Sequence, residues 1–326
     1  MKHPYLIITI DTEEGFDWCK PFSRTGYTTE SLFNHDFHMS GFYRNYNVKP
    51  ISIVSYPLLN DPDCQKLLKT YHAQKRYFMG THLHSWVTPP YDEILSNDNS
   101  FARNLPHDLL LKKLTILTDK FIEVMGYHPI YYKSGRYGIS NRSYPMLENL
   151  GYEFDFTPFA KRDFKAVSGP NFTHINNTPY FSPKSKDVTV FPATADYIGS
   201  SKHNPLIKKL YNNDLLTRFK IRGICARLGL LNFIPLTPEG VSENEMKDLT
   251  RSLLKQGQTY FHLSYHSSSF TIKGNPYCQS QADIKLMSEK LKNYIHFFQE
   301  IGGNIALEER DLYTCTTDIN PYIFLN

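Results

Sequence analysis

Residues 5–14 read YLIITIDTEE, a short apolar run that passes directly into acidic residues. A short apolar run bounded in this way is typical of a buried β-strand. In proteins built from alternating strands and helices, functional groups gather at the carboxyl ends of the strands. The stretch therefore predicts a first strand that presents Asp11 and Glu13 at a functional edge.

Similar runs recur along the chain, and longer stretches with helical spacing separate them. Strands are predicted at Tyr5–Ile10, Pro50–Val54, Tyr77–His82, Ile130–Lys133, Tyr152–Phe156, Val188–Phe191, Thr259–His266 and Asn304–Leu307. Helices are predicted near Ser31–Arg44, Asp61–Ala73, Leu105–Met125, Asn141–Leu150, Ser242–Gln256 and Gln281–Ile301. This alternation predicts a parallel barrel or a doubly wound sheet. No Gly-x-Gly-x-x-Gly sequence or phosphate loop follows the first strand, which disfavours a nucleotide-binding fold.

The length and composition fit one globular domain. The 326 residues are 40% hydrophobic and 21% charged, an ordinary balance for a folded protein. A barrel domain of roughly 250 residues with insertions would fill this length, so we expect a single domain over residues 1–326, and nothing requires a second one. The five cysteines are scattered and lack C-x-x-C spacing, so they predict neither a disulfide framework nor a cysteine zinc site.

Three of the predicted strands end in carboxylates or histidines. Side chains two residues apart on an extended segment face the same way. Each strand end therefore presents a paired set: Asp11 with Glu13, His82 with His84, and His262 with Ser264 and His266. Carboxylates and imidazoles from separate strands can converge on one divalent metal ion, and nitrogen ligands favour zinc.

The order of these motifs resembles the NodB-like polysaccharide deacetylases, carbohydrate esterase family four, from Tyr5 to about Leu307. The matching stretches are Thr9–Glu13, Gly80–Trp86, Lys133–Gly138, Phe154–Pro158 and Leu263–His266. The resemblance implies a deformed (β/α) barrel of seven or eight parallel strands. It also implies metal-dependent removal of the acetyl group from an N-acetylated sugar in a bacterial-type envelope glycan, a polysaccharide or a lipopolysaccharide core.

The chain departs from the family pattern at two places. Thr12 stands where the family has a second aspartate, and Glu13 is the nearest replacement. Trp86 stands where the family has a second histidine, so His84 would substitute for it. An envelope-polysaccharide branch of the family has similar Asp-Thr-Glu and His-Leu-His patterns, and the chain resembles that branch.

The resemblance implies a role for each of these residues. Glu13, His82 and His84 would hold the metal ion, with zinc favoured. Asp11 would take a proton from the attacking water, and His266 would protonate the departing amine.

Further positions are implied around these groups. Arg136 would orient Asp11, with Lys133 as the other candidate. Asp155 would hold the tautomer of His266, and the backbone N–H of Tyr137 would face the oxyanion. Trp86 would bind sugar at the rim of the pocket.

The segment 202–235 concentrates positive charge in a chain whose net charge is only +4. Its basic residues are Lys202, Lys208, Lys209, Arg218, Lys220, Arg222 and Arg227, against the single acidic residue Asp214, with leucines interleaved. Such an amphipathic insertion, at about 200–240, can lie on an anionic membrane or bind an acidic glycan. An ordinary solvated face is the alternative. No nucleic-acid motif accompanies it, so we expect no nucleic-acid partner.

No apolar run reaches the roughly 18 residues that span a bilayer, and Tyr5–Ile10 is too short for a signal-peptide core. We therefore expect a cytoplasmic protein, which the basic segment could bring to the inner membrane. Two other functions stay open at this point. One is a catalytically inactive glycan-binding relative, and the other is a hydrolase of a cyclic amide or an O-acetyl ester on the same scaffold.

Overall fold

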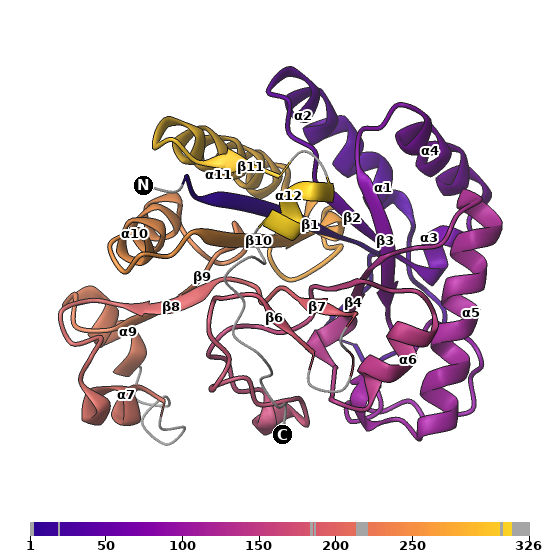
Figure 1. Ribbon diagram of the computed structural model, residues 1–326, viewed down its shortest axis with the longest axis horizontal. Helices are drawn as coiled ribbons and strands as arrows, with labels where there is room; N and C mark the ends of the chain where they lie inside the picture. Colours follow the sequence, from indigo (N-terminus) through magenta and orange to yellow (C-terminus); the bar gives the residue numbers. More distant parts are fainter. Residues whose placement is uncertain are drawn as a thin grey trace.

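The computed structural model describes residues 3–18, 20–182, 185, 187–212, 221–306 and 309–314. A curled sheet lies at the centre, and helices from both halves of the chain surround it (Figure 1). The strands of the main sheet are β1 (Tyr5–Thr12), β2 (Ile51–Ser55), β3 (Phe78–Leu83), β4 (Tyr131–Ser134), β5 (Phe154–Asp155), β6 (Tyr180–Phe181), β7 (Thr189–Val190), β10 (Tyr260–His266) and β11 (Asn304–Ile305). Every strand predicted from the sequence is present within the described residues; Leu307 lies outside them.

The sheet has the order β10-β1-β2-β3-β4-β5-β7-β6, and β11 also pairs with β1. All of these pairings are parallel except that of β6 with β7. The barrel is deformed where it closes, because no ladder joins β7 to β10 among the described residues. Two backbone hydrogen bonds bridge the gap, from Thr194 N to His262 O at 3.1 Å and from Ser264 N to Leu236 O at 3.3 Å.

The predicted helices are present with small differences in their bounds. They are α1 (Glu30–His35), α2 (Gly41–Asn45), α4 (Pro62–Ala73), α5 (His107–Met125), α6 (Ser143–Asn149), α10 (Glu243–Leu254) and α11 (Gln281–Glu300). The short helices α3 (Tyr56–Asn60) and α12 (Glu309–Thr314) were not predicted, nor were α7 (Pro205–Tyr211) and α9 (Ile221–Arg227). A π-helical turn at Asp36–Ser40 separates α1 from α2, so the first predicted helix is three consecutive pieces. Among the described helices, none is long and apolar enough to cross a bilayer.

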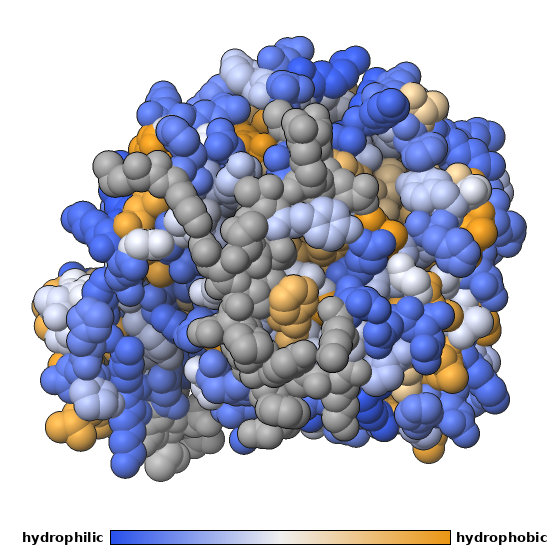
Figure 2. Space-filling model, in the orientation of Figure 1, coloured by the Kyte–Doolittle hydropathy of each residue, from blue (hydrophilic) through white to orange (hydrophobic). Residues whose placement is uncertain are grey.

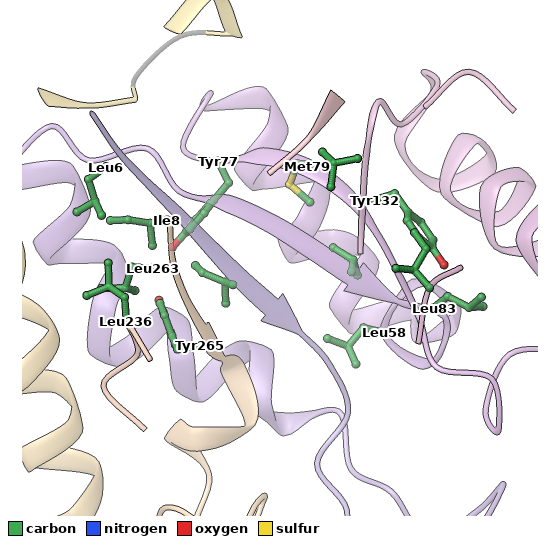
Figure 3. Packing of buried hydrophobic residues seen from close by; sticks show 14 of the residues in the cluster. Leu6, Ile8, Leu58, Tyr77, Met79, Leu83, Tyr132, Leu236, Leu263 and Tyr265 are labelled. Carbon is green, nitrogen blue, oxygen red and sulfur yellow. The ribbon is translucent and has the colours of Figure 1, made fainter. Parts of the chain in front are cut away.

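Alternate residues of each strand face two different cores. Leu6 and Ile8 of β1 pack with residues of the surrounding helices in the larger core, where Leu263 of β10 also lies (Figure 3). Ile7 belongs instead to the interior of the barrel, with Tyr131 and other residues of the facing strands. Because side chains alternate along a strand, later residues on the same face as Ile7 also point into the barrel, near its carboxyl end.

The segment between β7 and α10 forms a separate projection. It contains the two-stranded antiparallel sheet β8 (Ala195–Ile198) and β9 (Asn232–Pro235), with α7 (Pro205–Tyr211) and α9 (Ile221–Arg227) between them. These elements extend to the lower left of Figure 1, and hydrophobic and hydrophilic side chains mix on that surface in Figure 2. These elements cover the described part of the insertion predicted at about 200–240. Asp214, Arg218 and Lys220 lie outside the described residues.

Candidate active site

Three potential metal ligands meet at the carboxyl ends of β1 and β3. Glu13 follows β1, while His82 lies in β3 and His84 just beyond it. The Nε2 atoms of His82 and His84 lie 3.5 Å and 3.3 Å from Oε2 of Glu13. One ligand atom from each residue lies within 4.8 Å of the others, and all three side chains are buried. The structure thus brings together the three residues predicted as ligands.

The second nitrogen of each imidazole is already engaged. Nδ1 of His82 donates to the carbonyl oxygen of Lys133 at 3.1 Å, and Nδ1 of His84 lies 2.7 Å from Oε1 of Glu14. The hydroxyl of Ser55 donates to the other oxygen of Glu14. Outer hydrogen bonds of this kind fix the ring orientation of metal-binding histidines and leave Nε2 for the ion. The donor set therefore fits a divalent cation such as zinc.

The charges around the cluster shift the pKa of each ligand. Burial would raise the pKa of Glu13, but the imidazoles of His266, His82 and His84 hold that pKa well below its ordinary value. Burial and the neighbouring His84 lower the pKa of His82, so its imidazole is neutral. Burial acts in the same direction on His84, but Glu14 and Glu13 raise its pKa to about 10. A cation that binds His84 therefore displaces a proton.

Trp86 lies behind the site, and the prediction that it stands at the rim is wrong. Its side chain is only 2% exposed, and its ring stacks on His84 with centroids 4.2 Å apart. Phe16 and Phe22 enclose its other sides. Trp86 takes this place because the chain turns back after β3, which directs the side chain toward His84 rather than to the opening. The structure assigns it a supporting position.

Gly135 leaves room for the edge of the same imidazole. A Cβ atom at Gly135 would collide with Cδ2 of His84 and would lie 2.9 Å from its Nε2. Gly135 belongs to the motif stretch Lys133–Gly138, but the motif by itself predicted no packing role for it. Only a residue without a side chain lets β4 approach His84 so closely.

Lys133, not Arg136, holds Asp11. Its ammonium donates to the two Asp11 carboxylate oxygens at 2.6 Å and 2.7 Å and to the Ser264 hydroxyl at 2.6 Å. The prediction that Arg136 orients Asp11 is therefore wrong. Lys133, the alternative candidate, contacts Asp11 instead. The reason is register: Lys133 lies inside β4 two residues after Tyr131 and shares its interior face, whereas Arg136 lies beyond the end of the strand.

Asp11 is charged at neutral pH. Burial would raise its pKa, but Lys133 and the imidazoles of His82 and His266 lower the pKa below its ordinary value. Nε2 of His266 lies 3.5 Å from Oδ2 of Asp11. The two residues, 255 positions apart (266 − 11), are direct register partners in the pairing of β1 with β10.

Glu239 holds His266, so the prediction that Asp155 does so is wrong. Oε2 of Glu239 lies 2.7 Å from Nδ1 of His266, and its Oε1 accepts the His266 backbone N–H at 2.9 Å. Burial would lower the pKa of His266, but Glu239 and Glu13 raise it to about 10. The imidazole is therefore protonated at neutral pH. No sequence motif singled out Glu239, because it lies in the loop after β9 and reaches His266 only through the tertiary fold.

Asp155 lies in β5 and is satisfied locally. It accepts hydrogen bonds from the backbone N–H and hydroxyl of Thr157 and from the Tyr144 hydroxyl at 3.2 Å. Burial raises its pKa to about 7, although these hydrogen bonds act against the shift. The strand direction sends this carboxylate toward Tyr144 of α6 and away from the mouth of the barrel.

A cavity of about 300 Å³ opens over these groups. Its lining includes Asp11, Glu13, His82, His84, Lys133, Arg136, Tyr137 and His266, together with Trp18, Phe101, Phe164 and Tyr277. Tyr137 has a φ of 59°, in the left-handed region, which turns the chain at this wall. The indole N–H of Trp18 is buried and has no hydrogen-bond partner among the described residues. Trp18, rather than Trp86, is the tryptophan that lines the pocket.

Comparison with known proteins links the fold to several enzymes. No family model and no curated protein matches the sequence. Among solved structures, the chain is similar to a protein from Mycobacterium smegmatis assigned as a polysaccharide deacetylase, with a TM-score of 0.55 and 12% identity over 99% of this chain and 93% of the other. It is also similar to the PuuE allantoinase, with a TM-score of 0.52 and 12% identity over 99% and 96% of the two chains.

A third similar structure is the 4-alpha-glucanotransferase from Thermococcus litoralis, with a TM-score of 0.55 and 15% identity. This chain is covered completely but spans only 42% of the transferase. Identities this low establish the fold alone. The chain has the deformed (β/α)-barrel fold of the NodB-like polysaccharide deacetylases, as the motif order predicted.

Proposed function

We propose that this protein is a metal-dependent deacetylase of an N-acetylated sugar. The observation that carries the proposal is the placement of a carboxylate and an imidazole suited to proton transfer, Asp11 and His266, beside the cluster of Glu13, His82 and His84 in one cavity. A divalent ion held by these three residues, with zinc favoured, would lower the pKa of a bound water and polarise the acetamide carbonyl.

Asp11 is suited to accept the proton of the attacking water. Its carboxylate is ionised, and the two hydrogen bonds from Lys133 hold it in one orientation. The backbone N–H of Tyr137, in the wall of the same cavity, stays our candidate for stabilising the oxyanion.

His266 is suited to protonate the departing amine. Its pKa of about 10 keeps a proton on the ring at neutral pH, and Glu239 holds Nδ1, so Nε2 faces the cavity. The proposed base and acid lie on adjacent strands, and both line the cavity in which the acetamide would bind.

For the substrate, we propose an envelope glycan processed in the cytoplasm. The projection formed by α7 and α9 supports contact with an anionic membrane or an acidic glycan, because Leu206 and Leu228 are 70% and 66% exposed next to its lysines and arginines. An amphipathic basic surface of this kind binds anionic partners through charge and apolar contact together.

The decisive experiment combines bound-metal analysis with acetate release from chitin oligosaccharides. We expect about one zinc per chain, no bound metal in His82→Ala or His84→Ala, and a loss of turnover of about 10² to 10⁴ in Asp11→Asn and His266→Ala with metal retained. Stoichiometric metal in His82→Ala would show that the ligand set is wrong. His107→Ala, which removes an exposed histidine on α5, is the matched control.

The same assay separates the alternatives. Purified protein without bound metal and without acetate release would support an inactive glycan-binding relative. Hydrolysis of allantoin or of an O-acetylated sugar, without release from any N-acetylated sugar, would support a different hydrolase on this scaffold.

A further inference from the structure

Lys133, rather than Arg136, holds Asp11. Arg136 nevertheless lies in the wall of the same cavity. It lies in the turn after β4 with a φ of 53°, in the left-handed region. One terminal nitrogen of its guanidinium makes all of its hydrogen bonds, to the carbonyl oxygen and Oδ1 of Asn97 and to the hydroxyl of Ser100. The other two nitrogens have no partner among the described residues.

The charge of this guanidinium is not compensated. No carboxylate forms an ion pair with Arg136 in the part of the chain that the structure describes. Instead the group lies on the rings of Phe101 and Phe22, 4.1 Å and 5.1 Å from their centroids. Burial lowers its pKa to about 10, so it stays charged at neutral pH. A half-buried cation held this way by aromatic rings and neutral acceptors attracts an anion from solution.

A second cavity continues from this one. Phe164 and Val167 line both the metal pocket and a neighbouring cavity of about 810 Å³. The larger cavity is lined by Arg162, Lys165 and Arg222 and by aromatic rings that include Tyr197 and Phe233. Its Lys161 is paired with Asp196, and Asp163 is the one acidic residue among the described residues that line it.

Arg162 is the second uncompensated cation on this path. Its guanidinium lies 5.7 Å from the centroid of Phe164 and 5.6 Å from that of Phe233. No acidic side chain contacts it among the described residues. Phe164 thus separates two arginines, one beside the metal pocket and one in the adjoining cavity.

We propose that the substrate is an acidic glycan: an anionic group of the saccharide binds the free edge of Arg136, and the adjoining sugars pass over Phe164 to Arg162. This inference rests on the proposed function and names its substrate class. Two adjacent guanidinium nitrogens form a fork that binds a carboxylate or a phosphate through two parallel hydrogen bonds. Aromatic rings beside them offer faces on which sugar rings can pack.

The test measures binding in the zinc-loaded Asp11→Asn protein, in which turnover is blocked. The probes are a hyaluronan hexasaccharide, which alternates glucuronate with N-acetylglucosamine, neutral chitohexaose of the same length, and N-acetylglucosamine 1-phosphate. We expect tighter binding of at least one anionic probe than of chitohexaose. Adding Arg136→Gln should reduce that preference roughly 10- to 100-fold. Preference for the hexasaccharide alone identifies a carboxylate, and preference for the sugar phosphate alone identifies a phosphate.

A second variant protects the test against a folding defect at Arg136. Arg162 is exposed, so the Arg162→Gln variant should fold normally. It should bind the hyaluronan hexasaccharide more weakly and bind the small sugar phosphate with unchanged affinity. Lys66→Gln, at an exposed lysine on α4, is the matched charge control and should change nothing. Equal affinity for neutral and anionic probes, or an unchanged preference in both arginine variants, would overturn the proposal. Acetate release by the unmodified protein is measured separately. Its absence would refute the deacetylase function, whereas the binding preference is tested by the affinities alone.

Discussion

Glu239 and Asp155 show how the partner of one histidine depends on the fold rather than on a motif. Both are buried carboxylates, but only Glu239 contacts His266, through hydrogen bonds to the ring and to the backbone N–H. Asp155 is bonded to Thr157 and Tyr144 instead. The positioning residue of the proposed acid therefore comes from a loop that no motif marked.

This contrast predicts different effects of two isosteric changes. Glu239→Gln removes the charge that keeps His266 protonated and should lower kcat about 10- to 1,000-fold, with metal content unchanged. Asp155→Asn should reduce thermal stability by disturbing its local hydrogen bonds, and kcat of the folded fraction should stay within a few fold. Steady-state acetate release and a thermal scan of both variants measure this. A larger loss of kcat in Asp155→Asn would return the role to the residue predicted from sequence.

At the scale of single elements, β4 and the turn after it contact two groups of the candidate site. Lys133 projects from this strand to Asp11, and Gly135 gives space to the His84 ring. This strand and the turn after it therefore limit where Asp11 and His84 can lie.

Gly135→Ala should therefore displace His84 and weaken metal binding. The added methyl group would occupy the position of the imidazole edge, and Trp86 already packs on the face of the same ring. We expect at least tenfold weaker zinc affinity, in the range found when the groups around a ligand are disturbed. Competition with a chelator measures it. Gly41→Ala, at a helical position with open space around it and a φ of −62°, is the control for the general cost of losing a glycine.

The projection carrying α7 and α9 predicts a separable binding property. Replacing Lys208, Lys209 and Arg227 by Gln should weaken attachment to vesicles that contain phosphatidylglycerol, by on the order of 1 kcal/mol per residue and less at high salt. Turnover of neutral chitohexaose should be spared, because none of the three lines the metal pocket. Flotation of vesicles at two salt concentrations measures attachment. Equal attachment of both proteins would leave an ordinary solvated surface as the interpretation.

At the scale of the whole molecule, the pairing of β1 with β10 joins the two ends of the chain. It places Asp11 opposite His266 in the finished barrel. The same seam buries two other histidines: His262, whose Nε2 lies 2.7 Å from the Thr9 hydroxyl, and His35, whose Nε2 lies 2.7 Å from the Tyr265 hydroxyl. Burial lowers the pKa of each to about 3.

These buried imidazoles predict that the free energy of unfolding decreases in acid. The folded protein keeps each ring neutral, whereas the unfolded chain takes up a proton below a pH of about 6.5. The stabilisation is therefore present above that pH and is lost as the pH falls toward the folded pKa of about 3, at up to about 1.4 kcal/mol per pH unit for each histidine. Urea unfolding of the wild type and of His262→Gln between pH 7 and pH 5 measures it. The stability difference between them should shrink with falling pH, and a constant difference would contradict the assignment. His35→Gln gives an independent second case.

The sequence alone determined the alternation of strands and helices, the fold class and the grouping of Glu13, His82 and His84. These features depend on local patterns: apolar runs mark strands, and residues two apart share a face, so Asp11 with Glu13 and His82 with His84 had to reach the same edge. Other features depended on long-range packing. The partner of Asp11 followed from the register of β4, and that of His266 from a loop after β9. Trp86 turned inward because its ring packs on His84. No local pattern encodes such contacts, because they form only when distant segments meet in the closed barrel.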